Sequence, residues 1–158
     1  MDPVPFADIQ QEFEARVRRI VWATAATVDT AGRPRVRLLH PVWEGTDAWD
    51  TTRPDSLKMK HLARQPYMSL AYWDPAHALV YADCKVELVE DLAEKRRACE
   101  YIKAQEPPYG FDPASIWPGP DAPGFALLRL RAFRIRLEGV GASGDPAPPR
   151  TWLRNEHA

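Results

Sequence analysis

The sequence predicts a mainly β domain, an antiparallel barrel of six strands with short helices beside it. Residues 78–89 alternate apolar and polar side chains, which is the period of a half-buried strand. Short runs of branched and aromatic residues are separated by turn sequences such as Asp29-Thr30-Ala31-Gly32. Helical spacing is confined to a few short segments, so hairpin-joined strands are expected to dominate.

The first 64 residues predict a helix, three strands and a second helix. Apolar residues recur at helical spacing from Phe6 to Ile20, which is typical of an amphipathic helix lying on a core. Strands are expected at residues 20–28, 34–43 and 48–53, and Gly32 supplies the positive φ of the first turn. The second helix is expected at residues 56–64, because Ser56 or Asp55 is a suitable cap and Pro66 follows.

The remainder predicts three strands, at residues 66–73, 78–89 and 125–140, and one helix. Asp91 and Glu94 resemble a capping box that opens a helix ending near Gln105. Prolines crowd residues 107–123, which predicts a long ordered loop, and residues 146–149. We therefore expect one domain over residues 1–140 and a flexible C-terminal tail over residues 141–158.

Composition excludes several classes of protein. The net charge of -1 gives no global attraction to nucleic acid or anionic lipid. The two cysteines, Cys84 and Cys99, lie far apart, which argues against a disulfide scaffold and a zinc site. No apolar run is long enough to cross a bilayer, and no secretory signal is visible at the N-terminus. We expect a cytoplasmic protein without a metal, a membrane or a nucleic-acid partner.

A cluster of basic and hydroxyl side chains predicts an anion site. Arg35 and Arg37 leave one face of a strand, and a helix start near Ser56 favours phosphate. The cluster consists of Arg35, Arg37, Thr51, Thr52, Arg53, Ser56, Lys58 and Lys60. On spacing alone, the alternative to an anion site is a strand face exposed to water beside exposed helix lysines.

The order of these residues resembles the pyridoxamine 5'-phosphate oxidase-like superfamily of flavin-binding split β-barrels. The resemblance is carried by Arg35-Val36-Arg37-Leu38-Leu39-His40, Trp49-Asp50-Thr51-Thr52, Ser56-Leu57-Lys58 and residues 62–70. It implies a six-stranded antiparallel split β-barrel, and a homodimer with flavin mononucleotide (FMN) between the subunits. Arg35 and Lys58 match phosphate-binding positions, with Thr51, Thr52 and Ser56 beside the phosphate. Val36, Arg37 and Leu38 match the strand that runs along the flavin ring.

Three departures from the family pattern argue against pyridoxamine phosphate as the substrate. Leu57 stands where an arginine is common, and His40 replaces a lysine that holds the substrate phosphate. The Arg-Leu-His-Asp-Arg-like ending is absent. We therefore expect an FMN-dependent oxidoreductase acting on another small molecule.

Two alternatives and two residue roles stay open. The cofactor is alternatively a deazaflavin, with Arg53, Lys60 and Arg64 meeting its longer acidic tail, or the protein binds flavin or haem without turnover. Trp117 in the proline-rich loop either covers a planar cofactor or pins the loop to the barrel. His40 either donates a proton beside the ring or, as we favour, hydrogen-bonds on a strand face. His61 and His77 are expected on the surface. No other residue is singled out as catalytic, because a bound flavin carries the hydride chemistry itself.

Overall fold

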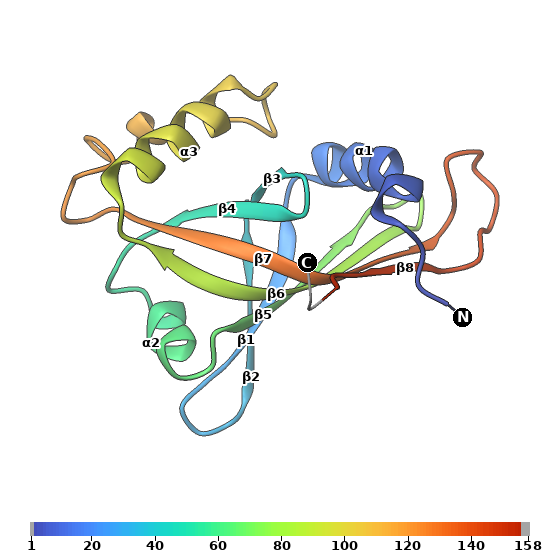
Figure 1. Ribbon diagram of the computed structural model, residues 1–158, viewed down its shortest axis with the longest axis horizontal. Coiled ribbons are helices and arrows are strands. Elements are labelled where there is room, and N and C mark those ends of the chain that lie inside the picture. Colours follow the sequence, from blue (N-terminus) through green and yellow to red (C-terminus); the bar gives the residue numbers. More distant parts are fainter. Residues whose placement is uncertain (1, 156–158) are drawn as a thin grey trace.

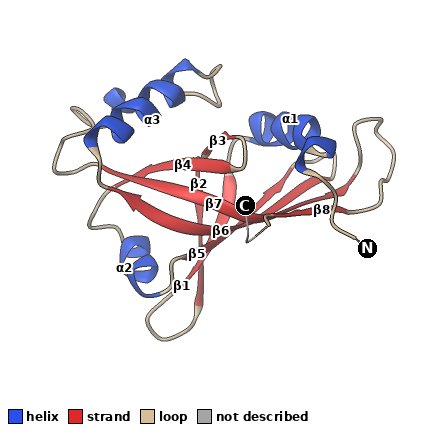
Figure 2. Cartoon of the chain, in the orientation of Figure 1, coloured by secondary structure: helices blue, strands red, loops and turns tan. Residues whose placement is uncertain are grey.

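A computed structural model describes residues 2–155, which form one strongly curved antiparallel sheet with three α-helices (Figures 1 and 2). The helices are α1 (Gln10–Ile20), α2 (Leu57–Arg64) and α3 (Leu92–Ala104), with 3-10 turns η1 (Phe6–Asp8) and η2 (Pro113–Ser115). The strands are β1 (Ala23–Val28), β2 (Pro34–Leu39), β3 (Val42–Glu44), β4 (Asp47–Thr52), β5 (Tyr67–Trp73), β6 (Ala78–Val89), β7 (Ala126–Gly139) and β8 (Arg150–Leu153). No helix among the described residues is both long enough and apolar enough to span a membrane.

The sheet is a split barrel. Its strands pair in the order β2-β1-β5-β6-β7-β4-β3, and β8 adds to β7. The two ends of this path, β2 and β3, are consecutive in the chain and are joined only by His40 and Pro41. The sheet must therefore curl until its ends meet. Within residues 2–155 no hydrogen-bonded ladder joins β2 to β4, so the barrel stays open along that line.

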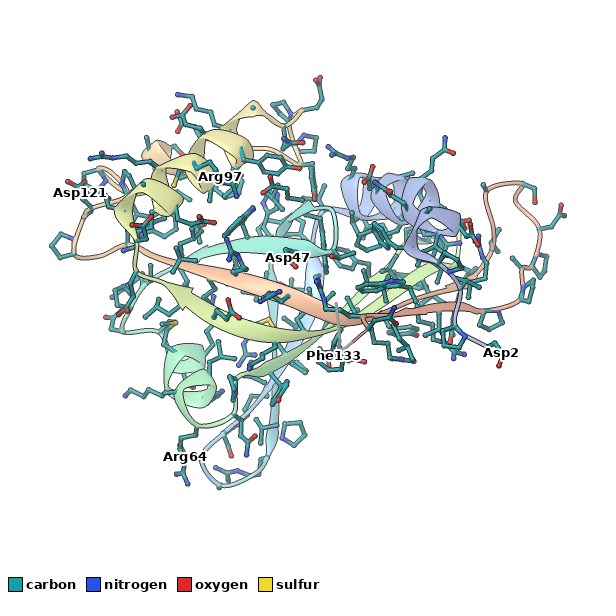
Figure 3. All side chains as sticks on the ribbon, viewed as in Figure 1. Asp2, Asp47, Arg64, Arg97, Asp121 and Phe133 are labelled. Carbon is teal, nitrogen blue, oxygen red and sulfur yellow. The ribbon has the colours of Figure 1, made fainter. Side chains whose placement is uncertain are left out.

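Two apolar clusters hold the helices on the sheet. The larger fills the barrel and includes Phe13 and Val17 of α1 beside inward residues of β5, β6 and β7. Phe13 meets Trp43 edge-on, with ring centroids 4.9 Å apart. The smaller cluster lies between α3, the loop after it, and the outer side of β4 and β7. In Figure 3, Arg97 projects from α3 above β4; its guanidinium pairs with Glu44 at 3.0 Å.

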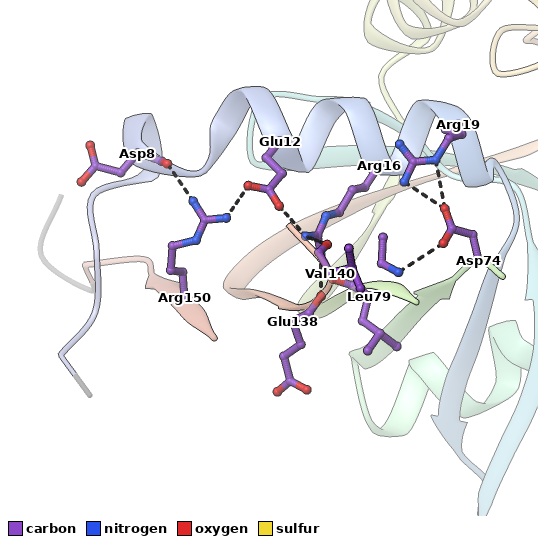
Figure 4. Close-up of polar contacts among 10 residues, drawn as sticks. Asp8, Glu12, Arg16, Arg19, Asp74, Leu79, Glu138, Val140 and Arg150 are labelled. Carbon is purple, nitrogen blue, oxygen red and sulfur yellow. Dashed lines mark hydrogen bonds and ion pairs between the residues drawn. The ribbon is translucent and has the colours of Figure 1, made fainter. Parts of the chain in front are cut away.

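Arg16 ties α1 to the end of the long β6–β7 ladder (Figure 4). Its guanidinium, 3% exposed, donates to the carbonyls of Leu79, Glu138 and Val140 at 2.6–2.8 Å. It also pairs with Glu12, which a second arginine, Arg150, contacts from the C-terminal strand. One buried cation therefore satisfies three carbonyls where the ladder ends.

The predicted class of fold is confirmed, whereas the number of strands is wrong. The expected strand 34–43 is interrupted at His40 and Pro41, because proline has no N–H for a ladder and restricts its own φ. The segment expected to be a flexible tail contains β8, whose residues Arg150–Leu153 pair with β7. Prolines 146, 148 and 149 lie before that strand and not within it.

Candidate functional site

The open line between β2 and β4 is lined by basic side chains of β2. Arg35 lies opposite Thr27 and Arg37 opposite Ala25 in the β1–β2 ladder, and both partners are buried. Directly opposed residues share a face of the sheet, so the two arginines leave from its inner side. Val36 and Leu38 leave from the outer side, where they are 69% and 66% exposed. The expectation that Arg35 and Arg37 share one face is confirmed.

A buried ion pair crosses from β4 to α2. Lys58 Nζ lies 3.0 Å from Asp50 Oδ2, and the two residues are 9% and 3% exposed. Burial raises the pKa of Asp50 above its ordinary value, while the nearby charges of Lys58, His40 and Arg37 oppose that rise. Burial also lowers the pKa of Arg37, against the attraction of Asp50. The charges of Lys58, His40 and Arg37 thus all favour the ionised form of this carboxylate.

Two hydroxyls stand at the start of α2. Thr52 Oγ1 donates to Ser56 Oγ at 3.4 Å. Ser56 is the N-cap of α2, and its side chain makes no capping hydrogen bond. The first backbone N–H groups of a helix have no partner within that helix, and they favour an anion. Thr52, Ser56 and Lys58 therefore form one polar corner at the start of α2.

Arg35 and Thr51 are placed differently from that corner. The Arg35 guanidinium bonds Asp29 Oδ2 at 3.1 Å in the β1–β2 turn, and its side chain is 53% exposed. Arg35 is thus bound to the Asp29 carboxylate, at the end of β2 that adjoins the β1–β2 turn. Thr51 points to the opposite side of β4 from Asp50 and Thr52, because side chains alternate along a strand.

A pocket of about 400 Å³ adjoins the polar corner and contains three of the predicted residues. Its wall includes Trp22, Leu38, His40, Thr51, Phe111 and Trp117. Asp50 lines it too, so the His40 pocket, as we name it, and the ion pair share one residue. Apolar walls with a few polar groups are typical of sites for small planar ligands.

His40 and Trp117 pin the loop that closes this pocket. His40 Nε2 lies 2.7 Å from the carbonyl of Tyr109, and because a carbonyl only accepts, Nε2 carries the proton. Burial lowers the pKa of His40, while that hydrogen bond and Asp50 oppose the shift. Trp117 meets Phe125 edge-on at 5.3 Å. Trp117 therefore anchors the loop and also lines the pocket, so both roles considered for it remain open.

Two polar residues are buried here although the sequence did not predict it: Asp50 and His61. Asp50 lies on the inner face of β4 with buried Ala48 and Thr52. Because side chains alternate between the two faces of a strand, Asp50 must share the face of Ala48 and Thr52, and this spacing is visible in the sequence. His61, expected on the surface, is 2% exposed, and its Nδ1 lies 2.9 Å from Thr27 Oγ1. This contact fixes α2 against β1. Within residues 2–155 no group of three or more metal-binding side chains occurs.

Comparison with known proteins agrees with this architecture. A family model described as pyridoxamine 5'-phosphate oxidase matches residues 9–139. No curated protein matches the chain in sequence.

Three solved structures share the fold at low sequence identity. A pyridoxamine 5'-phosphate oxidase-related, FMN-binding protein from Nostoc punctiforme has a TM-score of 0.70 at 20% identity, covering 98% of this chain and 93% of its own. A haem-binding protein from Mycobacterium smegmatis has a TM-score of 0.64 at 21% identity, covering 89% and 57%. An F420 reductase has a TM-score of 0.57 at 18% identity, covering 77% and 94%. At these identities the likeness shows the fold alone.

Proposed function

Because the chain belongs to the pyridoxamine 5'-phosphate oxidase family, we propose that it is an FMN-dependent oxidoreductase acting on a small molecule. The observation that carries the proposal is the polar corner beside the His40 pocket. Thr52, Ser56 and Lys58 offer hydroxyl, helix-end and ammonium donors to a phosphate, and Arg37 leaves from the inner side of β2. Arg35 would join them on leaving Asp29, to which it is bound.

The ring of the flavin would lie along β2 and the His40 pocket. Leu38, Thr51 and Trp117 line that pocket, and Val36 and Arg37 lie on the same strand as Leu38. When bound, the flavin supplies the hydride chemistry. The protein then needs to orient the ring, exclude water with the loop that carries Phe111 and Trp117, and admit the substrate. His40, whose Nε2 donates to the Tyr109 carbonyl, is a titratable group in the pocket wall beside the proposed position of the ring.

We further propose that the protein is a homodimer with the cofactor at the subunit interface. The outer face of β1, β2 and β5 exposes large apolar side chains that no described helix covers: Trp22, Val36, Leu38 and Trp73 are 55%, 69%, 66% and 56% exposed. The register places Leu38, Thr24 and Ala71 in one row and Val36, Ala26 and Ser69 in the next, so small side chains lie beside the large apolar ones on this face. A patch of this kind marks an interaction surface. A second copy fits because the patch adjoins the His40 pocket through Trp22 and Leu38.

The test is an equilibrium titration with FMN and with riboflavin, followed by flavin fluorescence. We expect wild type to prefer FMN, and the double variant Arg35→Ala, Lys58→Ala to lose at least about tenfold in FMN affinity while binding riboflavin as before. Lys60→Ala, an exposed lysine on the same helix, is the matched control. Circular dichroism confirms that each variant is folded. Absence of FMN binding by wild type would overturn the proposal, and an equal loss for both ligands would overturn the phosphate assignment.

Turnover needs its own measurement. Protein loaded with FMN is mixed anaerobically with a reduced nicotinamide nucleotide, and bleaching of the flavin band is followed. Bleaching faster than that of free FMN supports an oxidoreductase. A bound flavin that no such donor reduces supports the second candidate, a non-catalytic flavin-binding protein.

A deazaflavin remains the alternative cofactor, on one specific observation. Lys60 and Arg64 are four residues apart on α2, so they share one exposed face, and Arg64 lies at the end of that helix (Figure 3). An acidic tail extending from the polar corner would follow this face. Tighter binding of coenzyme F420 than of FMN, reversed by Lys60→Ala and Arg64→Ala, would establish it. Haem has less support, because His61 is 2% exposed and lies against Thr27, and no observation marks the Nδ1 of His40 as an axial ligand.

A further inference from the structure

Asp50 places a negative charge inside the site proposed for a phosphate. It is 3% exposed, and its carboxylate lies 3.0 Å from the Lys58 ammonium. Its inward neighbours along β4 are Ala48 and Thr52, and its partner across the ladder is Leu128. The barrel interior around it is thus apolar or hydroxylated. An apolar residue would fill this position with less loss of solvation.

The carboxylate and a phosphate would compete for the same cations. Lys58 is 9% exposed, so its charge requires a counter-ion close by. His40 lines the same pocket as Asp50. The charges of His40 and Arg37 also favour the ionised form of Asp50, against the rise of its pKa on burial. A phosphate monoester carries between one and two negative charges near neutral pH, about -1.5 to -2. Two such anions cannot share one ammonium in a buried corner without strong repulsion.

We propose that Asp50 is a built-in competitor of the flavin phosphate for Lys58, and that it makes the flavin an exchangeable ligand instead of a permanently bound one. The inference rests on the proposed function, since it assumes that the polar corner receives the phosphate. It assigns Asp50 the role of setting affinity. A flavin that takes a hydride from a reduced nicotinamide nucleotide, which is thereby oxidised, and then leaves would act as a co-substrate. The protein would supply this reduced flavin to another acceptor or to a second enzyme.

The experiment compares wild type with Asp50→Asn, which keeps the shape and an oxygen acceptor for Lys58 but removes the charge. Affinities for FMN and riboflavin are measured by flavin fluorescence. Asp50→Asn should bind FMN at least about tenfold more tightly, and riboflavin within about twofold of wild type, because only FMN carries the phosphate. Gel filtration should strip FMN from wild type and leave it on the variant.

Asp55→Asn is the matched control. Asp55 lies in the same connection between β4 and α2, but it is exposed and its partner is the exposed Arg53. Its removal should leave the preference for FMN over riboflavin unchanged. An equal gain in Asp55→Asn would show that the effect is one of general charge and would overturn the inference.

A second variant keeps the proposal testable if Asp50→Asn does not fold. Asp50→Asn combined with Lys58→Gln removes both members of the ion pair and leaves no buried unpaired charge. It is compared with Lys58→Gln alone, which keeps the carboxylate. The double variant should prefer FMN over riboflavin more strongly than Lys58→Gln does, because the repulsion from Asp50 is gone. An equal preference in the two variants would mean that Asp50 does not act on the phosphate, and the inference would be wrong.

The outcomes separate this inference from the function it rests on. If wild type binds FMN and Asp50→Asn binds it no more tightly, the inference fails and the proposed function stands. If Asp50→Asn tightens FMN and riboflavin equally, Asp50 acts on the ring, and the inference again fails alone. If neither protein binds FMN or riboflavin, both the inference and the proposed function are overturned.

Discussion

The guanidinium of Arg16 donates a hydrogen bond of 2.6 Å to the carbonyl of Leu79, across 63 positions of sequence. Two further carbonyls, those of Glu138 and Val140, accept from the same side chain. The opening helix α1 is therefore held on the β6–β7 ladder by hydrogen bonds to backbone carbonyls as well as by apolar packing.

Arg16→Ala should destabilise the protein by about 3 kcal/mol, because it leaves three buried carbonyls without their donor and Glu12 with Arg150 in place of two arginines. Arg19→Ala is the control on the same helix. Its partner is Asp74 at 2.9 Å, but its side chain is 54% exposed, so its removal should cost less than about 1 kcal/mol. Urea unfolding followed by circular dichroism measures both. Equal costs would show that the carbonyl contacts of Arg16 contribute nothing of their own.

Gly139→Ala should be far more damaging than Gly32→Ala, although both glycines have nearly the same backbone, with φ of +81° and +80°. A Cβ on Gly139 would lie 1.9 Å from the carbonyl oxygen of His77, whereas a Cβ on Gly32 meets nothing within 4 Å. We expect about 1 kcal/mol for Gly32→Ala, from φ alone. Gly139→Ala should cost about 3 kcal/mol or more, since backbone must move. Thermal melts of both variants check this, and equal losses would refute the steric argument.

The sequence predicted the elements whose signals are local. The alternation in residues 78–89 corresponds to β6, and the positive φ of Gly32 occurs in the first turn. The Asp91 side chain accepts from the Glu94 N–H at 2.8 Å, as a cap should. These features depend on residues only a few positions apart, so a short stretch of sequence is enough to predict them.

The missed features depend on contacts between distant segments. The strand β8 forms because β7 is long enough to offer it an edge, and the prolines before it gave the opposite local signal. Asp50 and His61 are polar residues that composition assigns to the surface. Each is buried because a partner from another element meets it, Lys58 and Thr27 respectively. The inner-face arginines and the hydroxyl corner were predictable, whereas the charge that neutralises Lys58 was not.

The β1–β2 turn should lose stability in acid through Asp29. The carboxylate accepts from the backbone N–H groups of Arg33 and Ala31 and from the side chains of Arg35 and Arg33. These bonds, the Arg33 N–H first among them, hold the pKa of Asp29 well below its ordinary value. An aspartate in the unfolded chain has a pKa of about 3.9, so the unfolded state binds the extra proton first. The stabilisation is therefore complete above about pH 5 and falls as pH drops below about 4.

Asp29→Asn should accordingly melt at a lower temperature than wild type at pH 7, and the difference should shrink as the pH is lowered from 5 to 3. Asp121→Asn, at an exposed loop position, is the control, and its melting temperature should follow that of wild type throughout. A difference between Asp29→Asn and wild type that stays constant with pH would mean that the asparagine harms the turn by shape and not by charge.

The last prediction concerns the outer face of β1, β2 and β5. Val36→Asp and Leu38→Asp should convert the proposed homodimer to a monomer, because each puts a carboxylate on the centre of an apolar patch. Both side chains are already more than half exposed, so the monomer should stay folded.

Leu88→Asp is the control: Leu88 is 50% exposed on β6, and β1 and β5 separate it from β2 in the sheet. Sedimentation velocity at micromolar concentration measures the mass. A wild type that sediments as a monomer would contradict the proposed dimer. Variants that remain dimeric would show that the interface lies elsewhere. Since Leu38 also lines the His40 pocket, loss of the dimer should weaken binding of FMN and riboflavin alike, in contrast to the phosphate-selective effect of Lys58.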